Sequence, residues 1–334
     1  MKMEDLMLKF PHLPEQIFQK LKNESLFKSR EVARPWQNLI DGRNYPWLRI
    51  VNFPTMLKRG NTYLHLTAET GQIQAFKIAF SEEKDKNIAN EFGVTTFYRA
   101  CENGRFLIVQ FLLENTDTQI NVNAKDNKSI DLNATTQIGR TAFNEACFKG
   151  HTDVIKLLID NATNLGIDVN TKDVTSKTAF IRACIEGLTD VVKIIMDNAA
   201  SFSIDLNATD RFGRTAFIWA CIEGHTDVVK IFMEKSAVLR IDLNAKSRNG
   251  MTAFHASCSN RHLDVVKNFI ENAAALSINL DTKDNNGMTA CNIAIMNKHS
   301  NVIQILRENA VGCFRVCREE YERLCMSKGT VDSM

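Results

Sequence analysis

Gly213-Arg214-Thr215-Ala216-Phe217 is the clearest copy of a motif that returns along this chain at a fixed interval. Its Thr-Ala-Phe part recurs every 37 residues, with the threonine at positions 141, 178, 215 and 252, and a weaker Thr-Ala-Cys copy follows at Thr289. A constant period of this length indicates that each unit is one supersecondary element, which cannot bury its apolar face alone. Such units stack into a solenoid with long exposed surfaces instead of a closed pocket. The repeat therefore favours a protein that binds other proteins over one that transforms small molecules.

Each repeat contains the pattern of two helices joined by a tight turn. In the first copy of the regular series, Thr141 is placed to cap a short helix over residues 142–149. Gly150 supplies the left-handed residue between the helices. A second helix is expected over residues 152–165, with apolar residues at helical spacing on more than one face. The segment before each copy, such as Asp210-Arg211-Phe212-Gly213, is typical of a tight turn.

These features together resemble the ankyrin repeat. Residues 213–229 carry the resemblance most completely, with Gly-x-Thr-Ala-Phe followed by Ala-Cys, Gly-His and Asp-Val-Val. Two earlier and less regular copies start near Thr62 and Thr95, so that about seven units cover residues 61–312. The resemblance implies an all-α solenoid of paired antiparallel helices with short hairpin-like loops that project at right angles.

Four departures from the ankyrin pattern carry structural predictions. The period is 37 residues where 33 is typical, and the extra residues follow the second helix, which we expect to be one turn longer. Arg261 and Lys298 replace the inter-helix glycine of the last two units, where a left-handed backbone is strained. Only His65 and His255 keep the histidine of the family's Thr-Pro-Leu-His motif, which weakens the inference of the usual histidine-mediated bonds but not that of the fold. A longer step between the second and third motif threonines indicates a nine-residue insertion around residues 127–135.

The beginning of the chain differs from the repeats, because all five prolines lie within the first 54 residues. We expect a helical module over residues 1–52, a linker over 53–60 and the repeat array over 61–312, followed by a capping helix and tail over 313–334.

An apolar pattern within this module is similar to the F-box. Leu13-Pro14 is followed by Ile17-Phe18, and Val32-Ala33-Arg34-Pro35-Trp36 comes later. The F-box opens on Leu-Pro, continues with apolar residues at helical spacing and closes near a tryptophan. The resemblance implies docking onto the small adaptor subunit of cullin–RING ubiquitin ligases. The adaptor contacts would come from Leu13, Pro14, Ile17, Phe18 and Trp36. The alternative is that the module only caps the open end of the array.

Composition and cysteine placement restrict the partners and the compartment. The net charge is +2 with 24% charged residues, so no global basic field suggests nucleic acid. The sequence contains no run of 18 apolar residues, so no membrane span is predicted. The N-terminus lacks the apolar core of a signal peptide. Five cysteines share one repeat position, which favours small buried thiols over disulfides. They are Cys101, Cys147, Cys184, Cys221 and Cys258. Reduced thiols in turn favour a cytoplasmic or nuclear protein.

Enzyme chemistry has little support in the sequence. There is no glycine-rich phosphate loop, His-Glu-x-x-His or Gly-x-Ser-x-Gly motif, and no cofactor is expected. Four histidines, at positions 151, 225, 262 and 299, share one repeat position and are interpreted as scaffold residues. Cys313, Cys317 and Cys325 suggest a metal-binding or redox-responsive protein as a third reading. We favour instead a terminal helix from about residue 301 to 326 whose cysteines seal the last repeat.

The functional prediction rests on an apolar stripe in the expected concave groove of the array. Four apolar residues lie just after the Ala-Cys pairs or beside them: Phe148, Ile185, Trp219 and Ile222. The charged residues expected around them are Lys149, Arg182, Glu186 and Glu223. Apolar patches with a charged rim commonly mark protein-binding sites, although the same side chains could pack between the helices. The leading hypothesis is a substrate-recruiting subunit of a ubiquitin ligase that binds a target protein here. The alternative is a non-ligase scaffold or inhibitor.

Overall fold

The computed structural model describes residues 58–83, 85–116 and 130–309 of the 334-residue chain. In these ranges the secondary structure is helical, apart from two isolated bridges that close turns, Ala89 with Thr95 and Thr209 with Thr215. The chain divides into two compact units, Met1–Gln137 (unit 1) and Ile138–Met334 (unit 2), and each is described by itself.

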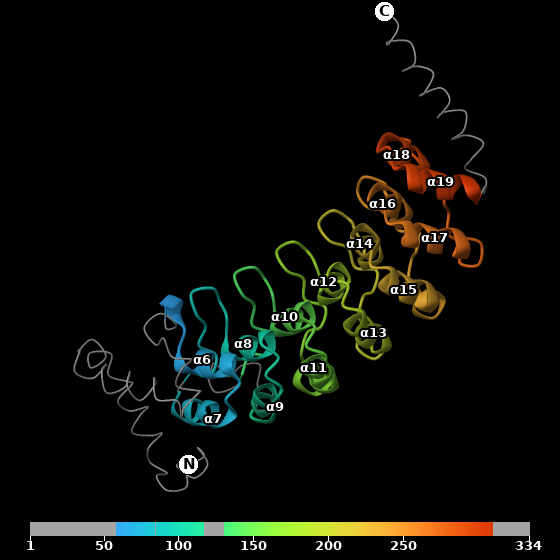
Figure 1. The fold of residues 1–334 in the computed structure, drawn as a ribbon. Helices are drawn as coiled ribbons and strands as arrows, with labels where there is room; N and C mark the ends of the chain where they lie inside the picture. The colour runs from blue at the N-terminus through green and yellow to red at the C-terminus, as the bar shows by residue number, and fades with distance from the viewer. Residues whose placement is uncertain (1–57, 84, 117–129, 310–334) are drawn as a thin grey trace, which may run out of the picture. The chain divides into compact units, whose positions relative to one another are not determined.

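The described part of unit 1 contains two helix pairs, which are blue to teal in Figure 1. A short 3-10 turn over Lys58–Gly60 leads into the first pair. The pairs are α6 (Tyr63–Thr70) with α7 (Ile73–Glu82), and α8 (Thr96–Glu102) with α9 (Phe106–Glu114). α6 packs on both α7 and α8.

Between residues 138 and 309, unit 2 contains five helix pairs stacked in chain order. The first helices of the pairs form one row and the second helices form a neighbouring row (Figure 1). The first helices are α10 (Ala142–Lys149), α12 (Ala179–Ile185), α14 (Ala216–Glu223), α16 (Ala253–Ser259) and α18 (Ala290–Met296). The second helices are α11 (Thr152–Leu165), α13 (Thr189–Asp197), α15 (Thr226–Leu239), α17 (Leu263–Asn272) and α19 (Ser300–Glu308). Among the described residues the all-helical repeat architecture predicted from the sequence is confirmed.

The motif threonine starts each first helix of unit 2. The Thr141 side chain accepts a hydrogen bond from the Asn144 amide, and Thr215 does the same for Ile218 at 3.3 Å. This bond satisfies one of the amides that a helix leaves free at its N-terminus. Gly150 ends α10 in the left-handed region at φ 76°. The bounds predicted for the first regular pair, 142–149 and 152–165, are confirmed.

A ladder of phenylalanines forms part of the core between the two rows of helices. Phe217 of the motif lies 5.2 Å, centroid to centroid, from Phe232 and 5.8 Å from Phe269. Phe254 repeats the contact with Phe269 at 5.3 Å, and all of these side chains are at most 2% exposed. Because each second-helix ring touches motif rings from two repeats, the ladder buries apolar surface between units.

The predicted cysteine ladder is confirmed as buried free thiols at positions 101, 147, 184, 221 and 258. Burial raises the pKa of the Cys184 and Cys221 thiols well above the ordinary value. A thiol that stays protonated is a poor nucleophile and metal ligand, so these residues serve packing.

Asparagine side chains join the loops that follow the second helices. The Asn207 side chain accepts a hydrogen bond from the Asp242 amide at 3.0 Å and donates one to the Arg240 carbonyl at 3.0 Å. Asn170 and Asn244 make the equivalent pair of bonds to the repeats that follow them. We call Asn170, Asn207 and Asn244 the asparagine clamp. It recurs with the 37-residue period but was not identified from the sequence.

The expected extra turn of the second helix forms in only part of the series. α11 and α15 have 14 residues, as predicted, but α13 and α17 have nine and ten, and the prediction is wrong for these two. After α13 the Ala199 amide bonds the Met196 carbonyl in a tighter turn, which breaks the regular helix. The stretch after each of these four helices nevertheless ends in the same type of hydrogen bond, from an isoleucine amide to the carbonyl five residues earlier. The bond from the Ile204 amide to the Ala199 carbonyl is an example. The path of the chain is thus kept while the internal hydrogen bonding differs.

Two further predictions have clear outcomes in the described residues. Arg261 and Lys298 do adopt the left-handed backbone, at φ 65° and 58°. The terminal helix expected from about residue 301 to 326 is not continuous, because α19 ends at Glu308 and Asn309 caps it. Only the end of the expected insertion is described, where Ile130 and Leu132 are buried.

No helix in the described part of the chain combines the length and the apolar character needed to cross a membrane.

Candidate protein-binding surface

The predicted groove residues lie on the first helices of unit 2, outside the core. Phe148, Ile185, Trp219 and Ile222 are half-buried, as is Arg182, whereas Lys149, Glu186 and Glu223 are exposed. By contrast, the motif alanine and cysteine that precede Ile222 are completely buried. The four apolar side chains therefore keep solvent-accessible surface next to exposed charges.

Trp219 is held by the turn that precedes its own helix. Its Nε1 donates a hydrogen bond to Oδ2 of Asp210 at 3.0 Å. Asp210 is only 3% exposed, and its other oxygen accepts the amides of Phe212 at 2.8 Å and Arg214 at 2.9 Å. The indole is thereby fixed in one orientation, which reduces the entropy that binding a partner would cost.

Cations lie over the Trp219 ring. Lys177 Nζ is 5.2 Å and Arg214 Cζ is 4.8 Å from the ring centroid. Both distances are in the range of cation–π attraction. Partial burial lowers the pKa of Lys177, with Arg182 and Arg211 adding to the shift and Asp210 and Asp173 opposing it. The sequence suggested an open Trp219 ring, but charged side chains cover part of its face.

Arg182 takes the place of tryptophan in the preceding repeat. Its Nε donates to Oδ2 of Asp173 at 2.8 Å, and the two groups form an ion pair. Burial alone would raise the pKa of Asp173. Hydrogen bonds from Thr175, Arg182 and the Lys177 amide outweigh it and hold the pKa below its ordinary value. The same turn carboxylate therefore holds an arginine in one repeat and a tryptophan in the next.

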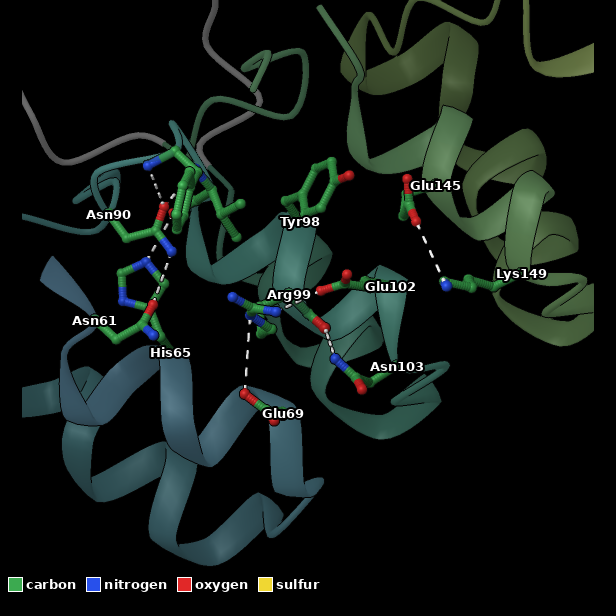
Figure 2. Close-up of polar contacts among 12 residues, drawn as sticks. Asn61, His65, Glu69, Asn90, Tyr98, Arg99, Glu102, Asn103, Glu145 and Lys149 are labelled. Carbon is green, nitrogen blue, oxygen red and sulfur yellow. Dashed lines mark hydrogen bonds and ion pairs between the residues drawn. The ribbon is translucent and has the colours of Figure 1, made fainter. Parts of the chain in front are cut away.

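Phe148 is likewise surrounded by positive charge. Arg140, Lys149 and Arg182 lie 5.0, 5.1 and 5.9 Å from its ring centroid. Glu145, one turn earlier on α10, is buried and pairs with Arg140 at 2.9 Å. It also pairs with Lys149 at 4.0 Å (Figure 2). The charged residues expected around the apolar stripe thus lie partly on top of it, and the surface consists of aromatic rings capped by cations.

Hairpin turns extend this surface beyond the first helices. We call residues 171–178, 208–215, 245–252 and 282–289 the finger row (Figure 1). Neighbouring fingers are joined by one backbone hydrogen bond each, as between the Arg248 amide and the Phe212 carbonyl at 2.9 Å. Phe212 and Val174 are 43% and 66% exposed, which makes them the largest apolar side chains open to solvent on these turns.

Histidines orient the groove residues from the neighbouring repeat. Nε2 of His225 donates to the Ile185 carbonyl at 2.8 Å, and Nε2 of His262 donates to the Ile222 carbonyl at 2.7 Å. A Cβ at Gly187 would lie 2.5 Å from the His225 ring, so glycine is required beneath it. The interpretation of these histidines as scaffold residues is confirmed for His225 and His262.

The position three residues after the motif threonine, which is histidine in the family motif, is His255 in one repeat and Asn144 in another. Nε2 of His255 donates to the Met288 carbonyl of the next repeat at 3.1 Å, while Nδ1 accepts the Thr252 amide. Asn144 makes related bonds, because its side chain accepts from the Thr141 hydroxyl and donates at 3.1 Å to the Thr171 carbonyl, which lies before the position equivalent to Met288. Inter-repeat bonds from this position are therefore not restricted to the two histidine-containing units.

Unit 1 carries charge at the position of Trp219. Arg99 of α8 binds Glu102 at 2.7 Å and approaches Glu69 at 4.0 Å (Figure 2). Beside it, Nε2 of His65 donates to the Val94 carbonyl at 2.9 Å, and Asn90 donates to Asn61 at 2.8 Å. This network braces the two pairs of unit 1 and offers no aromatic anchor at the equivalent position.

Several predicted site residues fall outside the described ranges. These are the F-box-like set Leu13, Pro14, Ile17, Phe18 and Trp36, and the cysteines Cys313, Cys317 and Cys325. Within the described ranges, no group of three or more His, Cys, Asp or Glu side chains is arranged to hold a metal ion.

Comparisons with known proteins agree with the geometry of the repeats. A family model described as ankyrin repeats (3 copies) matches residues 42–126, 127–210, 201–275 and 237–315. The crystal structure of the human ASB11 ankyrin repeat domain is similar in fold, with a TM-score of 0.60 and 20% sequence identity. That match covers 75% of this chain and 99% of the ASB11 chain. No curated protein sequence gives a significant match. Because the family model covers most of the sequence, the chain belongs to the ankyrin repeat family.

Proposed function

We propose that this protein is a substrate-recruiting subunit of a cullin–RING ubiquitin ligase. The ankyrin repeats would bind a target protein through the first helices of unit 2, and residues 10–40 would bind the adaptor subunit. Such a subunit needs no catalytic residue or cofactor of its own, and it would work in the cytoplasm or nucleus. The F-box-like sequence supports the adaptor half of the proposal, and membership of the ankyrin family supports the target half.

The observation that carries target binding is the fixed, half-buried Trp219. Tryptophan is over-represented among residues that dominate binding energy, and here its Nε1 is already bonded to Asp210 at 3.0 Å. Ile185 and Ile222 lie at equivalent places on neighbouring helices, and each has its carbonyl fixed by a histidine. A partner would meet a surface that needs little rearrangement.

Trp219→Ala tests target binding. We expect capture of the target to weaken at least about tenfold, while thermal unfolding changes little, because Asp210 retains its two backbone hydrogen bonds. Val238→Ala is the matched control, since Val238 is 83% exposed on a second helix of the same unit. A large loss of stability in Trp219→Ala, or equal loss of capture in both variants, would contradict this role.

Leu13→Asp combined with Pro14→Ala tests adaptor binding in the full-length chain. We expect this variant to lose co-purification of the adaptor and to keep target capture, whereas Trp219→Ala keeps the adaptor and loses the target. If the wild-type chain binds no adaptor, the ligase role is wrong. The alternative then stands, that the chain is an ankyrin scaffold or inhibitor whose N-terminal module acts as a cap.

A further inference from the structure

The finger row of unit 2 exposes positive charge, whereas its acidic side chains are buried or half-buried. Its four turns contain seven Lys or Arg residues, and five of these are exposed: Lys172, Arg211, Lys246, Arg248 and Lys283. The three acidic side chains of the same turns bind backbone amides instead of facing solvent freely. Asp173 and Asp210 are buried, Asp284 is half-buried, and each accepts two amide hydrogen bonds of its own turn.

The other side of the unit has the opposite character. Up to residue 309, the second helices and the segments that follow them, as far as the next finger, carry thirteen acidic and seven basic side chains, nearly all exposed. The fingers project beyond the row of first helices, away from these second helices (Figure 1). The described part of unit 2 is therefore electrically polarised, although the net charge of the chain is only +2.

Aromatic rings stand among the finger cations. Phe212 is 43% exposed, with the guanidinium carbons of Arg211 and Arg214 at 4.7 and 5.0 Å from its ring centroid. Arg214 also lies 4.8 Å from the centre of the Trp219 ring. A single arginine thus lies over one ring on the finger and one on the first helix. Apolar anchors and cations alternate over adjacent parts of the surface.

We propose that the finger row, together with Trp219, binds an acidic segment of the target protein that also carries aromatic or large aliphatic side chains. Carboxylates of the segment would pair with Arg211, Arg248 and the exposed lysines, and its apolar side chains would pack on Phe212 and Trp219. A row of like charges repels itself, so an acidic partner gains both the direct pairing and the relief of that repulsion. This inference rests on the proposed target-binding function and specifies the chemistry of its partner.

The test measures binding of three labelled probes to the full-length chain at about 0.1 M salt, where charges further apart than about 10 Å are screened. The first probe is a peptide that alternates Glu or Asp with Leu or Trp. The second has Gln and Asn in place of the acids, and the third is single-stranded oligo-dT. We expect only the acidic peptide to bind firmly, and its affinity to fall as salt is raised.

A pair of charge-reversal variants places the site. Arg211→Glu with Arg248→Glu should weaken the acidic peptide at least about tenfold, since both side chains lie on the fingers. Lys193→Glu with Lys230→Glu makes the same change of net charge on exposed second-helix positions, and should change the affinity less than about twofold. Circular dichroism melting checks that both variants fold.

Several results would overturn the inference. They are equal weakening by the two variants, equal binding of the amide peptide, absence of acidic-peptide binding, or tighter binding of oligo-dT at the same residues. Adaptor co-purification is measured on the same samples. Adaptor capture without acidic-peptide binding sinks this inference and leaves the ligase role standing, whereas the reverse result sinks the ligase role alone.

Discussion

Trp219 and Arg182 occupy the same position in neighbouring repeats, and a turn carboxylate nine residues earlier binds each of them. The carboxylate is required by the turn in either case, because it accepts two backbone amides. Its remaining hydrogen-bonding capacity is available to whichever donor the first helix presents. A fixed scaffold bond therefore positions a side chain that is free to vary between repeats, which is what a binding surface needs.

His255 gives the chain a pH-dependent stability. Burial lowers the pKa of His255 below 6.5, with Lys246 adding to the shift and bonds to Met288 and the charge of Asp284 opposing it. The pKa of His65 is lowered too, chiefly by burial. The unfolded chain thus binds more protons below pH 6.5, so stability should fall as pH drops through about 6.5 towards the lower folded pKa.

The replacement His255→Asn removes the titrating imidazole and keeps a side chain that can bond the next repeat, as Asn144 does to the Thr171 carbonyl. Urea unfolding measured between about pH 7.5 and pH 5 should show a shallower loss of stability for the variant. Each unit of pKa displacement corresponds to about 1.4 kcal/mol. An identical pH profile for wild type and variant would refute the assignment.

Arg261 is a strained residue that glycine should relieve. Its φ of 65° lies in the region that a Cβ disfavours, and Gly187 and Gly224 fill the equivalent position in the two preceding repeats. Arg261→Gly is expected to stabilise the protein by about 0.5–1 kcal/mol, since relief of strain exceeds the entropy that glycine adds to the unfolded chain. Arg261→Ala removes the same charge but keeps the Cβ, so it should give no gain in urea unfolding. Equal effects of the two changes would show that charge, not backbone conformation, controls stability here.

At the scale of the element, the helix boundaries of the first pair could be predicted because they depend on local chemistry. Thr141 caps the start of α10, and Gly150 ends the helix in the left-handed region. Both interactions involve residues only a few positions apart in the sequence. The asparagine clamp was missed although Asn170, Asn207 and Asn244 recur in the sequence at the repeat period. Their partners lie 33 to 35 residues away along the chain, and only the stacking of repeats brings them together. The length of the second helix was predicted wrongly for α13, which ends at Asp197 although the repeat period is the same as for α11.

The clamp predicts a specific loss of stability. Asn207→Ala removes two bonds to the next repeat, one to the Asp242 amide and one to the Arg240 carbonyl. Both bonds are solvent-exposed, so water replaces part of them and the expected cost is about 1 kcal/mol in urea unfolding. Asn286→Ala, at an exposed asparagine on a finger, is the control and should change stability by less than about half of that. If Asn207→Ala left the free energy of unfolding unchanged, the phenylalanine ladder and not the clamp would hold the repeats together.

At the scale of the whole molecule, the sequence predicted the class of function better than the details of the surface. The repeat period implied stacked units, and the groove residues are half-buried or exposed on the first helices of unit 2. The cations over Phe148 and Trp219 were not anticipated, because Arg140, Lys177 and Arg214 reach these rings through the folding of each turn onto its helix. The polarity of unit 2 likewise emerges only when exposed and buried charges are distinguished, since the total charge is close to zero.

Site-specific photo-crosslinking in cells tests the central claim most directly, namely that the first helices of unit 2 hold a protein partner. A photoreactive phenylalanine analogue would replace Ile185, Ile222 or, as the control on a second helix, Val238 in the full-length chain. The account predicts that positions 185 and 222 trap one and the same protein and that position 238 does not. Trapping of that protein at 238 with equal yield, or of unrelated proteins at 185 and 222, would contradict it.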